Sequence, residues 1–181
     1  VEVNEGDYLI SVDGEEVTTD NNPYQYLENK ADKYITITVN DKAAKEGSRT
    51  YTIKTISSEQ ELRFLDWTES RRKYVEERTD GRIGYIWLPN TLYEGNRELY
   101  KWFYPLANKE ALILDDRFNG GGFIPSMMIK LLERQTLNYW DRRGLQPLPD
   151  PLFSHDGPKA CLINGYSSSG GDAFPYYFRK L

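Results

Sequence analysis

The chain has 181 residues, a formal net charge of −5 at pH 7 and one cysteine, Cys161. Its 39% hydrophobic and 28% charged residues indicate a globular protein long enough for one full domain and part of another. The negative charge argues against a nucleic-acid or anionic-membrane surface. The single cysteine excludes an internal disulfide framework, and no signal peptide or apolar run of ~20 residues is present.

Short apolar segments separated by turns occupy the first 56 residues. We expect strands over residues 7–12, 34–39 and 49–56, the last two because apolar and polar side chains alternate there. Asn21-Asn22-Pro23 fits a helix cap with proline in the first turn, so a short helix is expected through Leu27. These elements predict a small β-rich module.

A long helix is expected after this module. Ser57-Ser58-Glu59-Gln60-Glu61 contains two overlapping capping boxes, and the helical pattern continues to about Arg78. The apolar positions Leu62, Leu65, Tyr74 and Val75 are spaced for one face of this helix. We therefore interpret the segment as a connector between two modules.

Strands alternate with helices in the remainder of the chain. Strands are expected over residues 81–88, 111–115 and 160–163 and near 137–140, helices over 99–106 and 124–134 and from 172 onward, and a proline-rich loop over 147–158. This alternation indicates a layered α/β structure with a largely parallel sheet. Ligands and nucleophiles of such sheets gather at the carboxyl ends of the strands.

One glycine-rich loop follows the last expected strand. Residues 164–171 include three serines and three glycines, with little side-chain bulk. A strand-to-helix turn of this kind can expose a serine hydroxyl and direct backbone amides outward, as a serine nucleophile requires. A Ser/Gly linker is the alternative. An α/β-hydrolase elbow fits poorly, because Ser169 has Ser167 where that motif needs glycine.

A second glycine-rich loop, Arg117-Phe118-Asn119-Gly120-Gly121-Gly122, follows the strand that ends at Asp115. Consecutive glycines cost backbone entropy and serve close approach or unusual dihedral angles. A phosphate loop is disfavoured, because no Gly-Lys-Ser/Thr follows. Two such loops at neighbouring strand ends could supply the two N–H donors that an acyl-transfer oxyanion needs.

The order of these motifs resembles the tricorn proteases, relatives of the C-terminal processing (tail-specific) peptidases. Residues 5–14 look like part of that family's PDZ domain, and residues 81–86, 115–124 and 169–176 look like its catalytic domain. The resemblance implies an α+β / α/β chain in which both domains are incomplete. A PDZ-like module would span residues 1–56, a connecting helix 57–80, and a layered (ClpP/crotonase-like) catalytic domain 81–181.

Carried over residue by residue, the resemblance makes Ser169 the nucleophile, with Gly170 and Gly121 as oxyanion donors. Some members have an acidic residue where this chain has Gly170, but a backbone donor does not need that side chain. Asp141 is implied in an S1 pocket that favours basic P1 side chains, and the alternative for Asp141 is a surface ion pair. The only histidine, His155, matches no family motif, and we expect it to lie too far from Ser169 to bond it.

The resemblance further implies a serine endopeptidase that cleaves short, unfolded peptides without metal or cofactor. A cytoplasmic homo-oligomer is expected, and an exported protein is not excluded. The family's catalytic histidine and a second serine precede its PDZ domain, and a catalytic glutamate follows the region matched here. We therefore expect the 181 residues alone to be inactive. The rival hypothesis is a non-enzymatic module that captures peptide termini and uses the α/β part as a scaffold or pseudo-peptidase.

Overall fold

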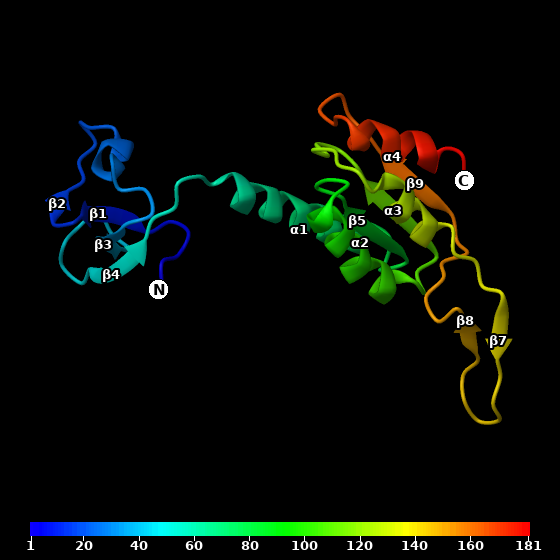
Figure 1. The fold of residues 1–181 in the computed structure, drawn as a ribbon. Helices are drawn as coiled ribbons and strands as arrows, with labels where there is room; N and C mark the ends of the chain where they lie inside the picture. The colour runs from blue at the N-terminus through cyan, green and yellow to red at the C-terminus, as the bar shows by residue number, and fades with distance from the viewer. The chain divides into compact units, whose positions relative to one another are not determined.

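The computed structural model describes residues 1–181 and divides into two compact units, residues 1–63 and 64–181. Figure 1 shows a small unit rich in strands at the N-terminal end and a mixed unit of strands and helices at the C-terminal end. None of the helices has both the length and the apolar character needed to cross a lipid bilayer.

The first unit is an antiparallel sheet of four strands in the order β2-β1-β3-β4. Its elements are β1 (Tyr8–Val12), β2 (Glu15–Glu16), the 3-10 helix η1 (Pro23–Leu27), β3 (Tyr34–Asn40) and β4 (Arg49–Lys54). Val12, Tyr26 and Ile35 form its buried core. The Asn22 side chain accepts a hydrogen bond from the Tyr24 amide, so the expected cap and strands are confirmed.

Helix α1 (Gln60–Arg78) begins where the capping pattern predicts, and the Ser58 hydroxyl oxygen accepts a hydrogen bond from the Gln60 amide (3.2 Å). The expectation that Leu62, Leu65, Tyr74 and Val75 share one face is wrong, since Leu65 and Tyr74 are nine residues (74 − 65), or about two and a half turns, apart and lie on opposite sides of the helix. Leu62, Leu65 and Tyr74 are each more than half exposed. Phe64 and Trp67 instead pack on aromatic side chains of the second unit. Aromatic surface in the tertiary partner decides which face of the helix is covered.

The second unit contains a parallel sheet of three strands in the order β5-β6-β9. Its strands are β5 (Ile83–Trp87), β6 (Ala111–Asp115) and β9 (Lys159–Leu162), and its helices are α2 (Tyr93–Leu106), α3 (Pro125–Leu132) and α4 (Gly170–Phe178). Apolar side chains of these elements form one buried cluster. The expected parallel α/β layers are confirmed, since α2 lies between β5 and β6 in the chain and α3 lies between β6 and β9.

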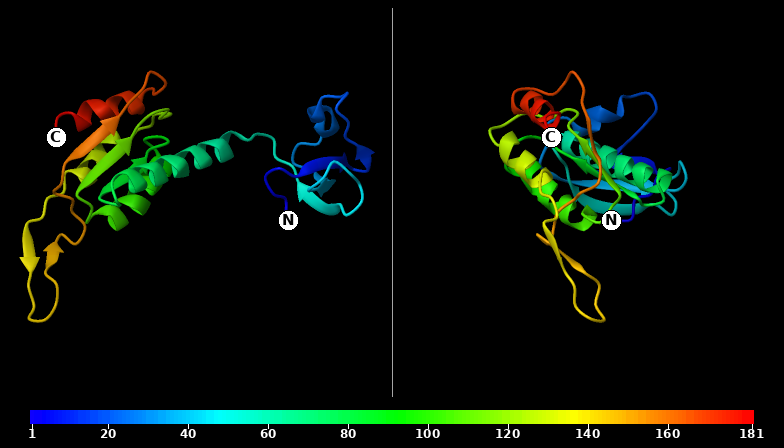
Figure 2. Two further views of the ribbon diagram at one scale, coloured as in Figure 1. Left: turned by 180° about the vertical axis from the view of Figure 1, so that it is seen from behind. Right: turned by 90° about the vertical axis from the view of Figure 1, so that its right-hand side faces the viewer.

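Two details of the second unit differ from the sequence prediction. Helix α2 begins at Tyr93 rather than Leu99, because the Asn90 side chain accepts hydrogen bonds from the amides of Leu92 and Gly95 and organises the first turn. The strand expected near residue 137 does not join the parallel sheet. It is β7 (Asn138–Trp140), which pairs antiparallel with β8 (Leu148–Asp150) inside the predicted proline-rich loop, and both form a separate hairpin (Figures 1 and 2).

The topology gathers three loops at one edge of the parallel sheet. The strands run in the same direction, so the segments after β5, β6 and β9 all leave from their carboxyl ends. The glycine loop (residues 119–122) and the serine turn (residues 164–169) are two of these segments. The hairpin extends from the other end of the unit, as both views in Figure 2 show.

Candidate active site

Ser169 stands at the turn between β9 and α4 in an unusual backbone conformation. It is the N-cap of α4, with φ 55° and ψ −118°, and its side chain makes no capping hydrogen bond. The residue is exposed, whereas Gly170 behind it is buried. Positive φ at a non-glycine residue costs free energy and persists only where the surroundings impose it. The turn therefore holds the Ser169 hydroxyl at the surface, free of intramolecular partners.

The glycine loop packs directly against the serine turn. A Cβ built on Gly121 would lie 2.7 Å from the Ser168 carbonyl oxygen and 2.9 Å from the Ser169 Cβ. The Ser168 amide donates a hydrogen bond to the carbonyl of Asn119 (3.1 Å) and so joins the two segments. The structure thus brings Ser169, Gly170 and Gly121 together, although they are separated by nearly fifty residues of sequence.

Two backbone amides at this junction have no hydrogen-bond partner. They belong to Gly122 and Gly170, and Gly170 is the first residue of α4. The Gly121 amide, by contrast, donates to Asn119 Oδ1 at 2.8 Å. Gly121 could act as an oxyanion donor only after releasing Asn119, whereas the neighbouring Gly122 amide is free. The positive end of the α4 dipole adds to the attraction that Gly170 offers an anion.

Thr91, in the loop after β5, closes the junction from a third side. Its amide donates to the Gly121 carbonyl (2.9 Å), and its carbonyl accepts from the Ile124 amide (3.1 Å). A Cβ built on Gly170 would lie 2.2 Å from the Thr91 hydroxyl oxygen and 2.1 Å from the Gly122 carbonyl oxygen. The Gly122 carbonyl and the buried Thr91 hydroxyl therefore leave no room for a side chain at position 170.

Two buried carboxyl groups lie at the carboxyl end of β6, where Asp115 is the last residue of the strand and Asp116 follows it. Asp115 accepts hydrogen bonds from the Tyr85 hydroxyl (2.6 Å) and the Arg117 guanidinium (2.6 and 2.8 Å). Burial and the Asp115 carboxylate raise the pKa of Tyr85 far above its usual range. Burial also raises the pKa of the Asp116 carboxyl to about 8, and the nearby carboxylates of Asp115 and Asp172 add to this shift. At neutral pH, Asp116 is therefore mainly protonated.

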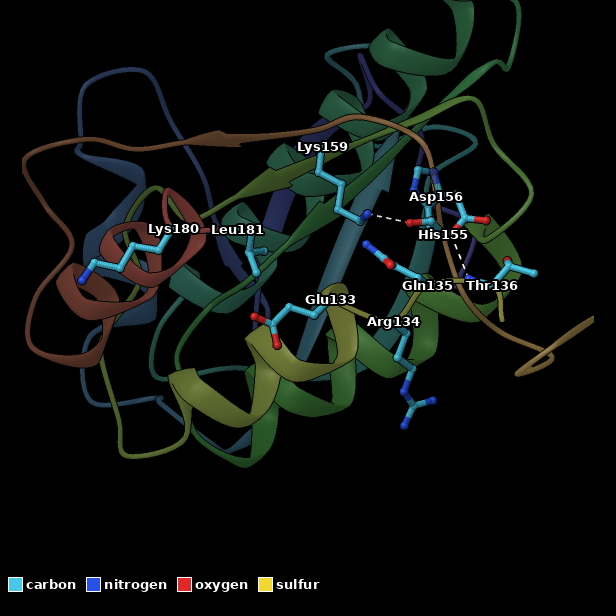
Figure 3. Close-up of a pocket in the computed structure, with 9 residues that line it drawn as sticks. All are labelled: Glu133, Arg134, Gln135, Thr136, His155, Asp156, Lys159, Lys180 and Leu181. Carbon is cyan, nitrogen blue, oxygen red and sulfur yellow. Dashed lines mark hydrogen bonds between the residues drawn. The ribbon is translucent and has the colours of Figure 1, made fainter. Parts of the chain in front are cut away.

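His155 lies away from this junction. It precedes β9, whereas Ser169 follows it, so the two residues stand at opposite edges of the sheet. His155, Asp156 and Lys159 line a cavity of ≈ 610 Å³, and Figure 3 shows these side chains near one another. Both ring nitrogens are buried without a hydrogen-bond partner, and burial lowers the pKa of the imidazole. The expectation that His155 does not bond Ser169 is confirmed.

Asp141 directly follows β7 in the hairpin and is exposed. The hairpin leads into β9 and extends from the end of the unit opposite the glycine loop (Figures 1 and 2). The structure therefore does not bring Asp141 and Ser169 of the same chain together. No ion pair joins Asp141 to a neighbouring arginine either.

The sequence interpretation did not single out Thr91, Asp116 or Asn119 as parts of the site. Asn119 directly precedes the glycine run and Asp116 lies three residues before Asn119, so closeness to the run is the local signal that could have indicated them. Thr91 carries no such signal, because it reaches the junction only through the packing of the loop after β5.

Two family models match this chain. That of the tricorn protease PDZ domain matches residues 1–58, and that of peptidase family S41 matches residues 82–181. The chain belongs to peptidase family S41. Both matches agree with the resemblance inferred from the motifs.

Similar proteins cover nearly the whole length of the chain. The putative tricorn-like protease C-terminal subunit of Sulfurisphaera tokodaii is 37% identical over 99% of this S41 chain and 20% of its own length. The tricorn protease of Thermoplasma acidophilum is 35% identical over 96% of this chain and 16% of its own length. A crystal structure of the tricorn protease superposes with a TM-score of 0.86 at 33% identity and covers 97% of this chain and 17% of that one. The S41 chain thus spans about a fifth or less of the length of these proteins.

Proposed function

We propose that this S41 chain supplies the nucleophile and the oxyanion donors of a tricorn-type serine endopeptidase that cleaves short, unfolded peptides. The observation that carries the proposal is the contact between two loops. An exposed serine in a strained turn lies against a glycine loop, and two unpartnered amides stand beside it. These are the groups that acyl transfer to a hydroxyl requires.

In the proposed reaction, Ser169 Oγ attacks the carbonyl carbon of the scissile peptide bond. The carbonyl oxygen becomes negatively charged and accepts hydrogen bonds from the Gly170 amide and from a second amide of the glycine loop. Gly121 is the second donor that the family resemblance implies, and the free amide of Gly122 is the alternative. Each donor of this kind lowers the barrier by ~2.7–4 kcal/mol.

A serine hydroxyl at its ordinary pKa needs a base within hydrogen-bond reach to take its proton. His155 stands at the opposite edge of the sheet, so the proposal takes the base from outside these 181 residues. We therefore predict that this chain by itself cleaves peptides at no measurable rate. The cytoplasmic location inferred from the resemblance also stays a prediction.

The proposed role of Asp141 requires a second copy of the chain. The hairpin that carries Asp141 extends away from Ser169 of the same chain (Figure 1). If the Asp141 carboxylate binds a basic P1 side chain, it must come from a neighbouring subunit of a homo-oligomer. An oligomer mixed from Ser169→Ala and Asp141→Asn chains would then recover part of the activity on substrates with arginine at P1, since some sites combine two intact residues.

The test of the proposed function is covalent labelling of the full-length protein with a fluorophosphonate. We expect one adduct, on Ser169, and loss of both the adduct and peptide cleavage in Ser169→Ala. Ser168→Ala is the matched control, because Ser168 joins the glycine loop through its backbone and its side chain makes no hydrogen bond. The control should keep both label and turnover.

The rival function is a non-enzymatic peptide-binding module or pseudo-peptidase. A folded full-length protein that binds peptides, takes no label and cleaves nothing would support the rival and overturn the proposal. If Ser168→Ala lost activity and Ser169→Ala retained it, the protein would still be a peptidase, but Ser169 would not be its nucleophile.

A further inference from the structure

The Asn119 side chain lies at the centre of the contact between the two loops. It is fully buried, and both ends of its amide are used. Nδ2 donates to Asp116 Oδ1 (2.8 Å), and Oδ1 accepts from the Gly121 amide (2.8 Å). The Asn119 carbonyl accepts from the Ser168 amide (3.1 Å). One residue thus fixes the glycine loop from within and holds the residue next to the nucleophile.

Asp116 holds the same two segments from the end of the central strand. It is fully buried, and its amide donates to the Leu162 carbonyl (2.9 Å), the last residue of β9. Its carbonyl accepts from the Ser167 hydroxyl (2.7 Å), and its Oδ1 accepts from Asn119. Asp116 Oδ2 is buried without a partner. The carboxyl group therefore depends on one hydrogen bond, the one to Asn119.

We propose that Asp116 and Asn119 form a positioning pair, which holds the glycine loop in register with the serine turn so that the free amides face the reacting carbonyl. The pair makes no hydrogen bond to Ser169 Oγ and acts through the Gly121 amide, the Ser167 hydroxyl and the Ser168 amide. The inference rests on the proposed function, because a register between these loops matters only if their groups react together. A donor misplaced by about 1 Å costs roughly 100-fold in rate.

The pair also makes the register sensitive to pH. Burial raises the pKa of Asp116 to about 8, and Asp115 on β6 and Asp172 on α4 act in the same direction. Cys161 on β9 also faces this carboxyl group and stays a neutral thiol, since burial raises its pKa to about 12. The Asn119 amide favours the ionised form and offsets part of the shift. Above this pKa, the hydrogen bond from Asn119 remains, but a second carboxylate appears in a buried site beside Asp115, and its desolvation and repulsion destabilise the packing of the two loops around the pair.

The experiment measures kcat and KM of the full-length enzyme for a peptide substrate between pH 7 and 9.5, together with the rate at which a fluorophosphonate labels Ser169. Asn119→Ala should lower kcat and the labelling rate about tenfold or more with little change in KM, because the loops lose register while peptide contacts remain. Wild-type kcat should fall as the pH rises through about 8.

Asp116→Asn keeps a neutral acceptor for Asn119 and cannot ionise. Between pH 8 and 9.5, the kcat of Asp116→Asn should therefore fall less than the kcat of the wild type. This holds whatever kcat the variant has at pH 7. Asn40→Ala is the matched control, because Asn40 is a buried asparagine in the first unit whose Nδ2 donates to the carbonyls of Ala44 and Glu46. It should lose stability without losing kcat.

Unchanged kcat in Asn119→Ala, or an alkaline fall in Asp116→Asn equal to that of the wild type, would overturn the positioning pair. If Asn119→Ala does not fold, the pH profile of Asp116→Asn decides by itself. Failure of the proposed function has a different signature, namely full turnover in Ser169→Ala. The two inferences can therefore fail independently.

Discussion

A single methyl group at position 170 should separate the two loops of the candidate site. Gly170→Ala places a Cβ 2.1 Å from the Gly122 carbonyl oxygen and 2.2 Å from the Thr91 hydroxyl oxygen, where ordinary contact begins at 3.4 Å. Both neighbours are held in place, because Gly122 lies in packed backbone, the Thr91 amide donates to the Gly121 carbonyl, and the Thr91 carbonyl accepts from the Ile124 amide. The glycine loop must therefore move by more than 1 Å relative to the serine turn.

The size of the effect follows from this displacement. Overpacking of a close contact costs about 1–3 kcal/mol of stability. Misplacing one oxyanion donor lowers kcat by roughly 10²–10³-fold, which corresponds to ~2.7–4 kcal/mol in the barrier. We therefore expect Gly170→Ala in the full-length enzyme to lose at least about 100-fold in kcat and to remain folded.

The assay is steady-state peptide cleavage combined with urea unfolding. Gly165→Ala is the control, since Gly165 lies in the same turn, its φ is not positive, and an added Cβ meets nothing within 4 Å. The control should keep both kcat and stability. Near wild-type kcat in a folded Gly170→Ala enzyme would refute the reasoning, because it would mean that the register of the two loops does not limit catalysis.

Other positions in the second unit give contrasts between single residues. In the glycine loop, Gly120→Ala should be tolerated, since its Cβ meets only the Pro89 carbonyl oxygen at 3.8 Å. Gly121→Ala should lose most of its kcat/KM, because its Cβ would lie 2.7 Å from the Ser168 carbonyl oxygen at a φ of +82°. Asp141→Asn should lower kcat/KM roughly 10-fold or more for substrates with Arg or Lys at P1 and leave apolar P1 substrates nearly unchanged, as expected from loss of a charge-assisted contact. The pKa of Asp116 is about 8 in the folded protein, above its ordinary value of 3.8, so the folded state keeps a proton that the unfolded state loses between these values. The free energy of unfolding is therefore highest below pH 3.8 and falls as the pH rises to about 8. Asp116→Asn should abolish this slope of up to about 1.4 kcal/mol per pH unit, measured by urea unfolding at several pH values.

Each of these predictions would be contradicted by a specific result. Equal sensitivity of Gly120→Ala and Gly121→Ala would mean that the loop does not depend on close approach to the serine turn. Equal loss for all substrates in Asp141→Asn would assign that residue a structural role. A wild-type slope of stability against pH in Asp116→Asn would place the titrating group elsewhere.

The sequence alone determined the order of the elements and the position of the two glycine-rich loops. Apolar runs such as residues 111–115 form buried strands because their character is continuous along the chain, and glycine followed by a helical pattern fixes where a turn must lie. Once strands and helices alternate, the parallel sheet follows, and with it the gathering of the loops after β6 and β9 at one edge. The placement of Ser169 beside Gly121 was therefore predictable.

Only the tertiary structure decided which groups at that edge are free to react. The hydrogen bond from the Gly121 amide to Asn119 Oδ1 spans only two residues and is a local turn that asparagine before glycine favours. The surroundings of Gly122, whose amide has no partner, depend instead on packing against Thr91 in another loop, which no pattern along the chain indicates. The shared apolar face predicted for α1 was wrong because Leu65 and Tyr74 lie about two and a half turns apart, on opposite sides of the helix. The side chains that are covered, Phe64 and Trp67, are those that contact Trp87, which is distant in sequence. The spacing of apolar residues along a helix indicates which side chains can be buried together. Which of them are buried depends on contacts with distant segments, and these contacts form only when the chain folds.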